Sequence, residues 1–155
     1  MNPEFEKIRQ AFSRPVPLPV KVTAEGFLLK GGPQAIEEIQ GRVIKATLLR
    51  KLFREGALRC YSPDGLRARD GTLCQECLHP ECRPQLRVHL HSPTFIFLLD
   101  LSGRSAENFL HLQDEVEEGG RELIDWILRL KVINHGHWGE VHFERWRAAG
   151  GGGSS

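Results

Sequence analysis

Four cysteines, all that the 155-residue chain contains, lie between residues 60 and 82. Cys74 and Cys77 form a Cys-x-x-Cys turn whose two sulfurs can reach one small ion, and Cys82 follows shortly after. Cys60 precedes them across a loop rich in glycine and aspartate. Four thiolates suit the tetrahedral coordination of structural zinc, which leaves no open position for a substrate. The spacing therefore predicts a zinc site made of Cys60, Cys74, Cys77 and Cys82.

The same cysteines are compatible with other chemistry. No apolar signal sequence precedes them, so we expect a cytoplasmic chain with reduced thiols, which disfavours two disulfides. A redox Cys-x-x-Cys would not need Cys60 and Cys82. An iron–sulfur cluster also uses four cysteines, and the spacing does not distinguish it from zinc. His79 is an alternative ligand, although a histidine before Pro80 is more often a solvated loop residue.

Catalytic motifs are missing from the sequence. It contains no HExxH, no GxSxG and no Walker loop. A four-cysteine zinc site is also closed to the water that a zinc hydrolase or nuclease activates. Asp64 and Asp70 resemble a hard-cation site, but Asp-Gly is ordinarily turn chemistry. We therefore expect a binding protein and no enzyme.

Charge is unevenly distributed, although the formal net charge is only +1. Residues 42–87 contain ten Lys and Arg against five Asp and Glu, an excess of five positive charges. Residues 107–125 contain seven acids and only one base, Arg121. A basic face attracts polyanions, and an acidic segment can dock a protein partner. Ordinary solvated surface explains both runs equally well at this stage.

The chain divides into three parts. Residues 1–19 contain prolines at alternate positions and are expected to form an extended N-terminal arm. Residues 20–147 are expected to form one domain, with the zinc loop 60–82 inserted in it. Residues 148–155 form a flexible Gly/Ser tail of natural or engineered origin. No apolar run approaches the roughly 20 residues of a membrane span, so no membrane partner is expected.

Residues 37–54 are the first long element, and their pattern fits both a helix and a strand. Gly41 followed by the β-branched Val43 and Ile44 favours a long, bent strand. On that strand, alternation places four side chains on one face: Lys45, Thr47, Lys51 and Phe53. Bases and an aromatic ring on one face suit a nucleic-acid strand, although a solvated sheet face would look the same.

The rest of the domain is predicted to alternate strands with a helix. Residues 20–30 are expected to supply an edge strand and residues 57–61 a short strand. Residues 85–91 and 94–101 form an antiparallel pair around Ser92-Pro93. A helix capped by Ser105 ends at Gly119-Gly120. Residues 121–129 fit a short helix, or a strand from Trp126. Residues 130–133 and 141–146 form a hairpin with Trp138 at its tip.

This order predicts an α+β, mainly β fold: an OB-like antiparallel Greek-key barrel with an inserted four-cysteine zinc loop and one to two helices. Such barrels bind single strands with a basic groove and aromatic stacking platforms. We therefore expect single-stranded nucleic acid as the partner, DNA more than RNA. The candidate contact residues are Lys45, Arg50, Lys51, Phe53, Tyr61, Arg67, Arg69, Arg87 and Trp138.

Several motifs together resemble those of a known class. They are Cys60-x-Ser-x-Asp-Gly65, Cys74-x-x-Cys77 with a further cysteine, Phe97-Leu-Leu-Asp-Leu101 and Ser102-Gly-Arg-Ser105. They are similar to motifs of small phage and mobile-element proteins assigned as single-stranded-DNA-binding OB-fold proteins. The chain departs from that class in lacking Gly-Gly before the Cys-x-x-Cys and a proline after it. The resemblance spans residues 56–143 and implies DNA binding.

A second hypothesis is a protein-interaction module. In that case the zinc loop is purely structural, and the acidic segment 107–125 docks a partner of a mobile-element or defence assembly. Salt-sensitive binding of single strands would discriminate between the two hypotheses, because only phosphate neutralisation releases counterions.

Overall fold

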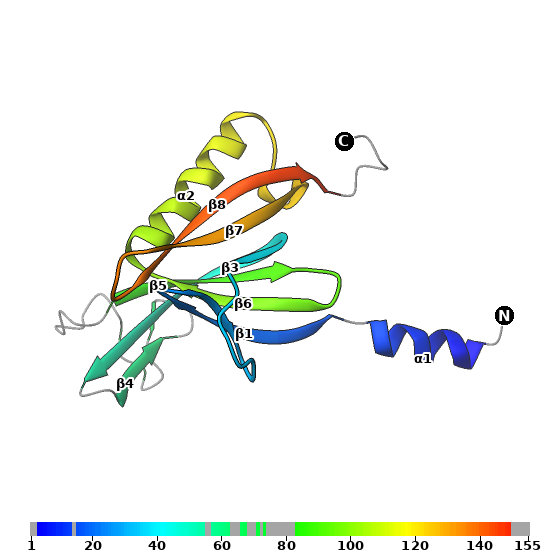
Figure 1. Cartoon of the computed structure of the whole chain (residues 1–155), viewed down its shortest axis with the longest axis horizontal. Coiled ribbons are helices and arrows are strands. Elements are labelled where there is room, and N and C mark those ends of the chain that lie inside the picture. The colour runs from blue at the N-terminus through cyan, green and yellow to red at the C-terminus, as the bar shows by residue number, and fades with distance from the viewer. Residues whose placement is uncertain are drawn as a thin grey trace.

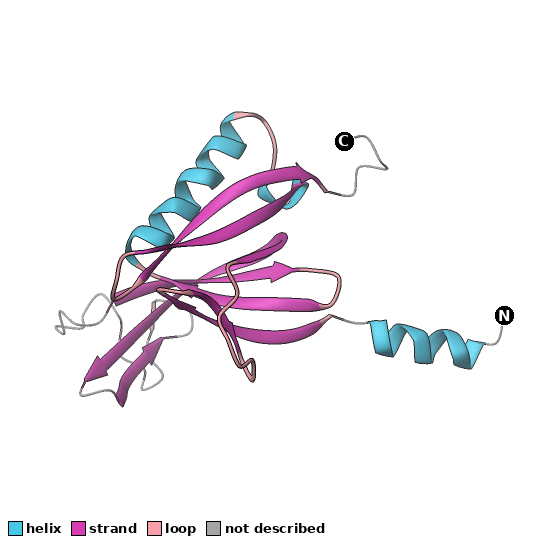
Figure 2. Cartoon of the chain, viewed as in Figure 1, coloured by secondary structure: helices cyan, strands magenta, loops and turns pink. Residues whose placement is uncertain are grey.

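The computed structural model of the chain describes residues 3–13, 15–54, 57–62, 66–67, 71, 73 and 83–149, without the side chains of residues 9–13, 52–54 and 57–60. The described residues form eight strands, two α-helices and a short 3-10 helix (Figures 1 and 2). The elements are α1 (Pro3–Ser13), β1 (Val16–Thr23), β2 (Gly26–Leu29), β3 (Glu38–Arg54), β4 (Ala57–Ser62), β5 (Arg83–His91), β6 (Phe95–Leu101), α2 (Gly103–Glu118), η2 (Leu123–Asp125), β7 (Trp126–Asn134) and β8 (Gly139–Ala148).

All eight described strands belong to one curled sheet. Their order is β2-β1-β6-β5-β3-β7-β8, and β4 pairs with β3 outside this path. β1 and β6 run parallel, whereas every other pair is antiparallel. The predicted α+β, mainly β fold is confirmed.

The long strand β3 confirms the prediction for residues 37–54 and joins the two halves of the sheet. Its first residues, 38–41, pair with β7, and residues 42–51 pair with β5. Gly41 lies at the crossing, where a Cβ atom would overlap the carbonyl oxygen of His91. The register with β5 shifts just beyond it, between Val43 and Lys45. A glycine and an irregular register are the features that let a strand bend, so β3 can serve both halves.

The prediction of an extended arm over residues 1–19 is wrong for most of its length. Residues Pro3–Ser13 form α1, because proline is tolerated in the first helical turn and acidic Glu4 and Glu6 suit that end. Residues 16–19 already belong to β1. Pro17 and Pro19 fit there because β2 pairs only with residues 20–23, so the ladder between β1 and β2 does not use the N–H groups that the prolines lack.

The hydrophobic core lies between the inner side of the curled sheet and α2. Phe109, Leu112 and Val116 of α2 face Leu99 of β6, Leu128 of β7 and other buried residues of the sheet, among them Val88, Leu90, Leu130 and Val141. Each buried aliphatic or aromatic side chain contributes about 1.5–3 kcal/mol. Packing in the core thus stabilises the sheet and fixes the positions of the residues on its outer face.

Helix α2 begins earlier than predicted. Its N-cap is Ser102, and the expected cap, Ser105, lies inside the helix and is buried. The Ser105 hydroxyl instead accepts a hydrogen bond of 2.8 Å from the backbone N–H of Val141 in β8. The predicted end at Gly119-Gly120 is confirmed, with Gly120 at a φ of 75°. No described helix has the length and apolar character needed to cross a membrane.

The strand pairs predicted downstream are confirmed. β5 and β6 pair antiparallel, and β7 and β8 form the predicted hairpin. Residues 121–129 divide into η2 and the start of β7 at Trp126. The hairpin comes against the end of β1, because a Cβ atom at Gly139 would overlap the carbonyl oxygen of Thr23. The curled sheet therefore nearly closes at this end.

Candidate functional site

Three neighbouring strands display charged side chains on the outer face of the sheet. Residues directly opposite each other in an antiparallel pair share a face. Lys51 of β3 lies opposite Tyr61 of β4 on one side and Arg83 of β5 on the other. The next rows along β3 place Arg87 and His89 of β5 beside Thr47 and Lys45, and Asp100 of β6 beside Arg87. We call Lys45, Lys51, Tyr61, Arg83, Arg87, His89 and Asp100 the basic face.

Asp100 is the electrostatic centre of the basic face. Its carboxylate accepts hydrogen bonds from Lys51 Nζ at 2.7 Å and from Arg87 Nε and Nη2 at 2.8 and 3.0 Å. Burial alone would raise the pKa of Asp100, but the hydrogen bonds from Arg87 and Lys51 hold it below its usual value. The hydrogen bond with Asp100 raises the pKa of Arg87, and Tyr61 adds to this rise. The carboxylate thus fixes two cations in place, and its single negative charge can neutralise only one of them.

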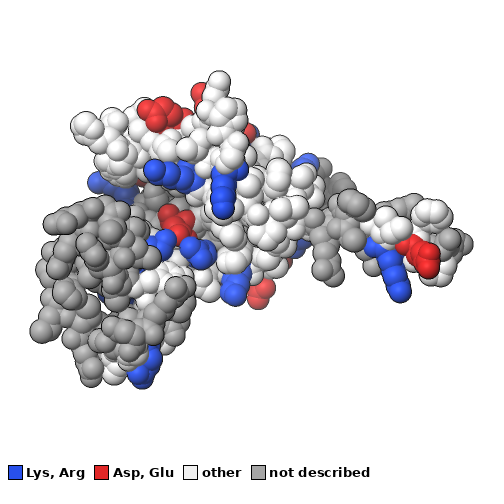
Figure 3. Space-filling model, turned by 90° about the horizontal axis from the view of Figure 1, so that it is seen from below, with Lys and Arg blue, Asp and Glu red and all other residues white. Residues whose placement is uncertain are grey.

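Burial and the neighbouring cations both lower the pKa of His89, the histidine in this face. Burial lowers the pKa of His89, and the charges of Lys45 and Arg87 lower it further. Lys45 and Arg83 are exposed, and neither makes an ion pair with another described residue. Figure 3 shows Lys and Arg side chains gathered across one face of the molecule, with an acidic group among them. An outer face of this kind attracts anions.

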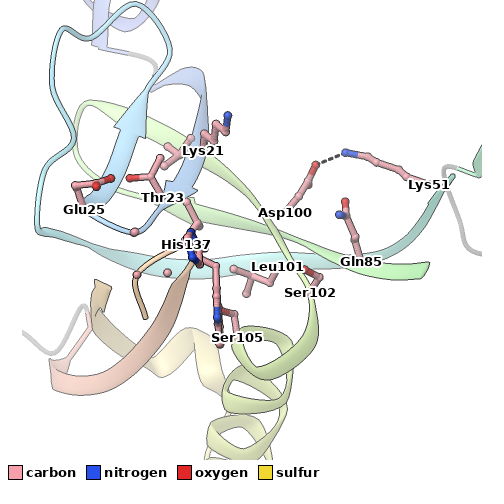
Figure 4. A pocket seen from close by; sticks show the side chains of 16 residues that line it. Lys21, Thr23, Glu25, Lys51, Gln85, Asp100, Leu101, Ser102, Ser105 and His137 are labelled. Carbon is pink, nitrogen blue, oxygen red and sulfur yellow. Dashed lines mark hydrogen bonds and ion pairs between the residues drawn. The ribbon is translucent and has the colours of Figure 1, made fainter. Parts of the chain in front are cut away.

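A cleft of about 960 Å³ adjoins the basic face. Lys51, Gln85 and Asp100 line one side, and the β1–β2 turn and the β7–β8 turn line the other (Figure 4). Trp138 lies in the β7–β8 turn, is 44% exposed and also lines the cleft. Its indole stacks on the His135 ring, with 4.4 Å between the centroids and 16° between the planes. An exposed aromatic ring therefore borders the same opening as Lys51 and its partner Asp100.

A buried carboxylate holds the hairpin that carries Trp138. The Glu140 side chain is only 7% exposed. It contacts His135 Nε2 at 2.8 Å and His142 Nε2 at 2.7 Å, and accepts a hydrogen bond of 2.9 Å from Asn108 of α2. The Asn108 hydrogen bond is the largest influence that lowers the pKa of Glu140, and with the two histidines it outweighs burial, so the value falls to about 2. This network ties the ring under Trp138 to α2.

The predicted contact residues are only partly brought together. Lys45, Lys51, Tyr61 and Arg87 share the basic face, with Trp138 across the cleft. Strand alternation places Arg50 on the opposite face from Lys51. Arg67 lies beyond β4, where its side chain donates to the Gly71 carbonyl oxygen at 2.8 Å. The Phe53 side chain and all of Arg69 lie outside the described residues.

The predicted zinc ligands also lie outside what the structure describes. Cys74, Cys77 and Cys82 are not described, and of Cys60 only the backbone is, as part of β4. In the described part of the chain no group of His, Cys, Asp and Glu is arranged to hold a metal ion. The zinc site therefore stays a prediction.

Three residues of the site were missed from the sequence: Arg83, Asp100 and Glu140. Arg83 carried a usable signal, since it belongs to β5, whose outward positions alternation identifies. Asp100 and Glu140 carried none, because their partners lie on other strands or on α2. Comparison of the chain with protein-family models, curated proteins and solved structures found no match.

Proposed function

We propose that this protein binds single-stranded nucleic acid, with DNA favoured, across the basic face and into the cleft bordered by Trp138. The observation that carries the proposal is that Lys51, held together with Arg87 by Asp100, lines the same cleft as the exposed indole of Trp138. Phosphates would contact the cations, and bases would stack on the aromatic rings. Stacking on one ring is worth about 1–3 kcal/mol per base and tolerates any sequence. The proposed role is binding without catalysis.

An OB-like interpretation of the sheet supports this proposal. β3, β5 and β6 are successive antiparallel neighbours, α2 leads from β6 to β7, and β7 pairs with both β3 and β8. OB barrels bind oligonucleotides on the face of their second and third strands and with the loops after their first and fourth strands. In this chain those positions correspond to β5, β6, residues 55–82 and the turn with Trp138. β1 precedes the five strands of this comparison, which are β3, β5, β6, β7 and β8. It adds a further wall to the cleft.

The salt dependence of oligonucleotide affinity gives a direct test of this proposal. Fluorescence anisotropy with labelled oligo-dT, oligo-U and duplex DNA, at low and at physiological salt, should show salt-sensitive binding that favours single strands. Each neutralised phosphate contributes about 0.7 to the slope of log affinity against log salt concentration. Absence of binding at low salt would reject the proposed function.

Removing from the basic face two cations that pair with no described residue should weaken this binding. The double variant Lys45→Gln with Arg83→Gln is expected to lose about tenfold in affinity at physiological salt and to lower the salt slope by about 1.4. The matched control removes the same charge from Lys7 of α1 and Arg121 after α2, both exposed. Equal losses in the two double variants would show that only net charge matters, against a defined site.

Zinc remains part of the proposal as a structural metal held by the four cysteines. The described residues on either side of the loop support this. Tyr61 and Arg83 lie opposite Lys51 from its two sides, so about 10 Å, two strand spacings, separates them. The loop thus leaves and rejoins the sheet at one place, as a closed metal loop would.

Metal binding should be coupled to folding. We expect one zinc per chain by elemental analysis, and a lower midpoint of thermal unfolding after chelation or in the Cys77→Ser variant. Restoring zinc should reverse the chelation effect in the wild type but not in the variant. Iron with visible absorption in place of zinc would indicate an iron–sulfur cluster instead.

The acidic side of α2 supports a second candidate function, the docking of a protein partner. Glu107, Asp114, Glu115, Glu117 and Glu118 are all exposed on this helix, together with Leu110, which is 49% exposed. Neutralising these acids would remove protein docking. It should leave the basic face, on β3, β5 and β6, able to bind oligo-dT.

A further inference from the structure

A second cluster, made of cations and an aromatic ring, lies at the open end of the β7–β8 hairpin. It consists of Arg129 of β7 and Trp146 and Arg147 of β8, which we call the distal patch. Trp146 of β8 lies eight positions after Trp138 of the β7–β8 turn. At about 3.4 Å per residue this corresponds to roughly 27 Å. The distal patch is therefore separate from the cleft.

Two guanidinium groups stack on the indole of the distal patch. The Arg147 guanidinium carbon lies 4.5 Å from the Trp146 ring centroid, and that of Arg129 lies 5.9 Å from it. Arg145 stacks instead on the Trp126 ring, at 5.4 Å, and its position opposite the buried Leu128 places it on the other side of the sheet. Trp146 nevertheless keeps 41% of its surface exposed. Rings already flanked by cations offer a face on which a base can stack while its phosphate meets a guanidinium.

The cations of the distal patch are only partly neutralised. Arg129 forms ion pairs with Glu38 of β3 at 3.3 Å and Glu144 of β8 at 3.2 Å. Arg147 is exposed and forms no ion pair with any described residue. A surface that combines exposed aromatic area with guanidinium groups that are not fully neutralised by described residues is complementary to a chain of bases and phosphates.

We propose that the distal patch is a second contact for the same single strand, reached only by a strand long enough to extend from the cleft across the outer face. This inference rests on the proposed function. The outer face supports such a path, because β3 pairs with β5 and with β7 and so continues the surface from the basic face to the hairpin. The occupant is an extended polynucleotide, with Trp146 as the stacking platform and Arg147 and Arg129 as phosphate contacts.

The test compares short and long oligo-dT, of about six and about twenty nucleotides; the first lies within and the second exceeds the site sizes of single OB folds, about 4–16 nucleotides. The variant Arg147→Gln should bind the long strand about threefold more weakly, with a salt slope reduced by about 0.7. Trp146→Ala should also weaken the long strand, by about tenfold. Affinity for the short strand should be unchanged in both variants.

The outcomes separate the two proposals. The charge-matched control Lys7→Gln should bind both strands as the wild type does. Equal losses for short and long strands, or wild-type affinity of the distal variants for the long strand, would overturn the second contact while leaving the cleft as the binding site. Absence of wild-type binding to either strand would overturn both.

Discussion

Replacing Asp100 with asparagine is expected to strengthen the binding of oligo-dT by about threefold to tenfold at low salt, with a steeper salt dependence. Asp100 neutralises one of the two cations that it fixes, Lys51 and Arg87. Without the carboxylate both cations become available to phosphates, and the net charge of the basic face rises by one. Anisotropy titrations over a range of salt concentrations measure the effect.

The same substitution should make the fold less stable. Hydrogen bonds to charged groups contribute about 1.5–3 kcal/mol each, and the Asp100 side chain is 24% exposed, so we expect a loss of about 2 kcal/mol. Because folding lowers the pKa of Asp100, its contribution is present at neutral pH and is lost as the pH falls below about 3.9. Urea unfolding of the two proteins should therefore differ at pH 7 and converge in acid.

Asp114→Asn is the matched control for the gain in oligo-dT affinity expected of Asp100→Asn. Asp114 is exposed on α2, and its replacement changes the net charge by the same amount. We expect the control to leave affinity nearly unchanged. Weaker binding by the Asp100 variant would mean that the carboxylate matters more for holding Lys51 and Arg87 in their binding positions than for neutralising them.

The sequence predicted the sheet well because local signals determine most of it. Alternating apolar residues identified β5 and β6, the glycine-containing turn identified the β7–β8 hairpin, and Gly41 indicated the bend in β3. The same alternation placed Lys45 and Lys51 on one face. Each of these features depends on residues that are neighbours along a single strand or turn.

Features that depend on pairing between distant strands could not be predicted. Nothing local to Pro17 and Pro19 shows that β1 finds a partner in β6, which lies almost 80 residues further along the chain. Ser102 and Ser105 are equally good caps by type, and only the bond from Val141 distinguishes the buried serine. Likewise, the partners of Asp100 and Glu140 become visible only when the strands and α2 are in place.

Glu140→Gln should weaken the binding of oligo-dT, whereas Asp100→Asn should strengthen it, although both substitutions remove one negative charge. The Glu140 carboxylate holds His135, on which the Trp138 ring stacks, and connects the hairpin to Asn108 of α2. Loosening the hairpin tip should weaken oligo-dT binding by about tenfold, comparable to losing one stacked base. It should also lower the midpoint of thermal unfolding. Electrostatics alone would predict tighter binding, so the sign of the change discriminates between the two roles.

The pH dependence of stability provides an independent test of the Glu140 network. Folding lowers the pKa of Glu140 from 4.5 to about 2, so the carboxylate stabilises the folded state above pH 4.5 and loses this effect as the pH falls towards 2. The unfolding midpoints of the wild type and of Glu140→Gln should therefore differ at neutral pH, and the difference should disappear as the pH falls from 4.5 towards 2. Glu115→Gln, an exposed change on α2, should follow the wild type throughout. Tighter binding by the Glu140 variant, or a difference in stability that does not depend on pH, would contradict a role for Glu140 in positioning Trp138.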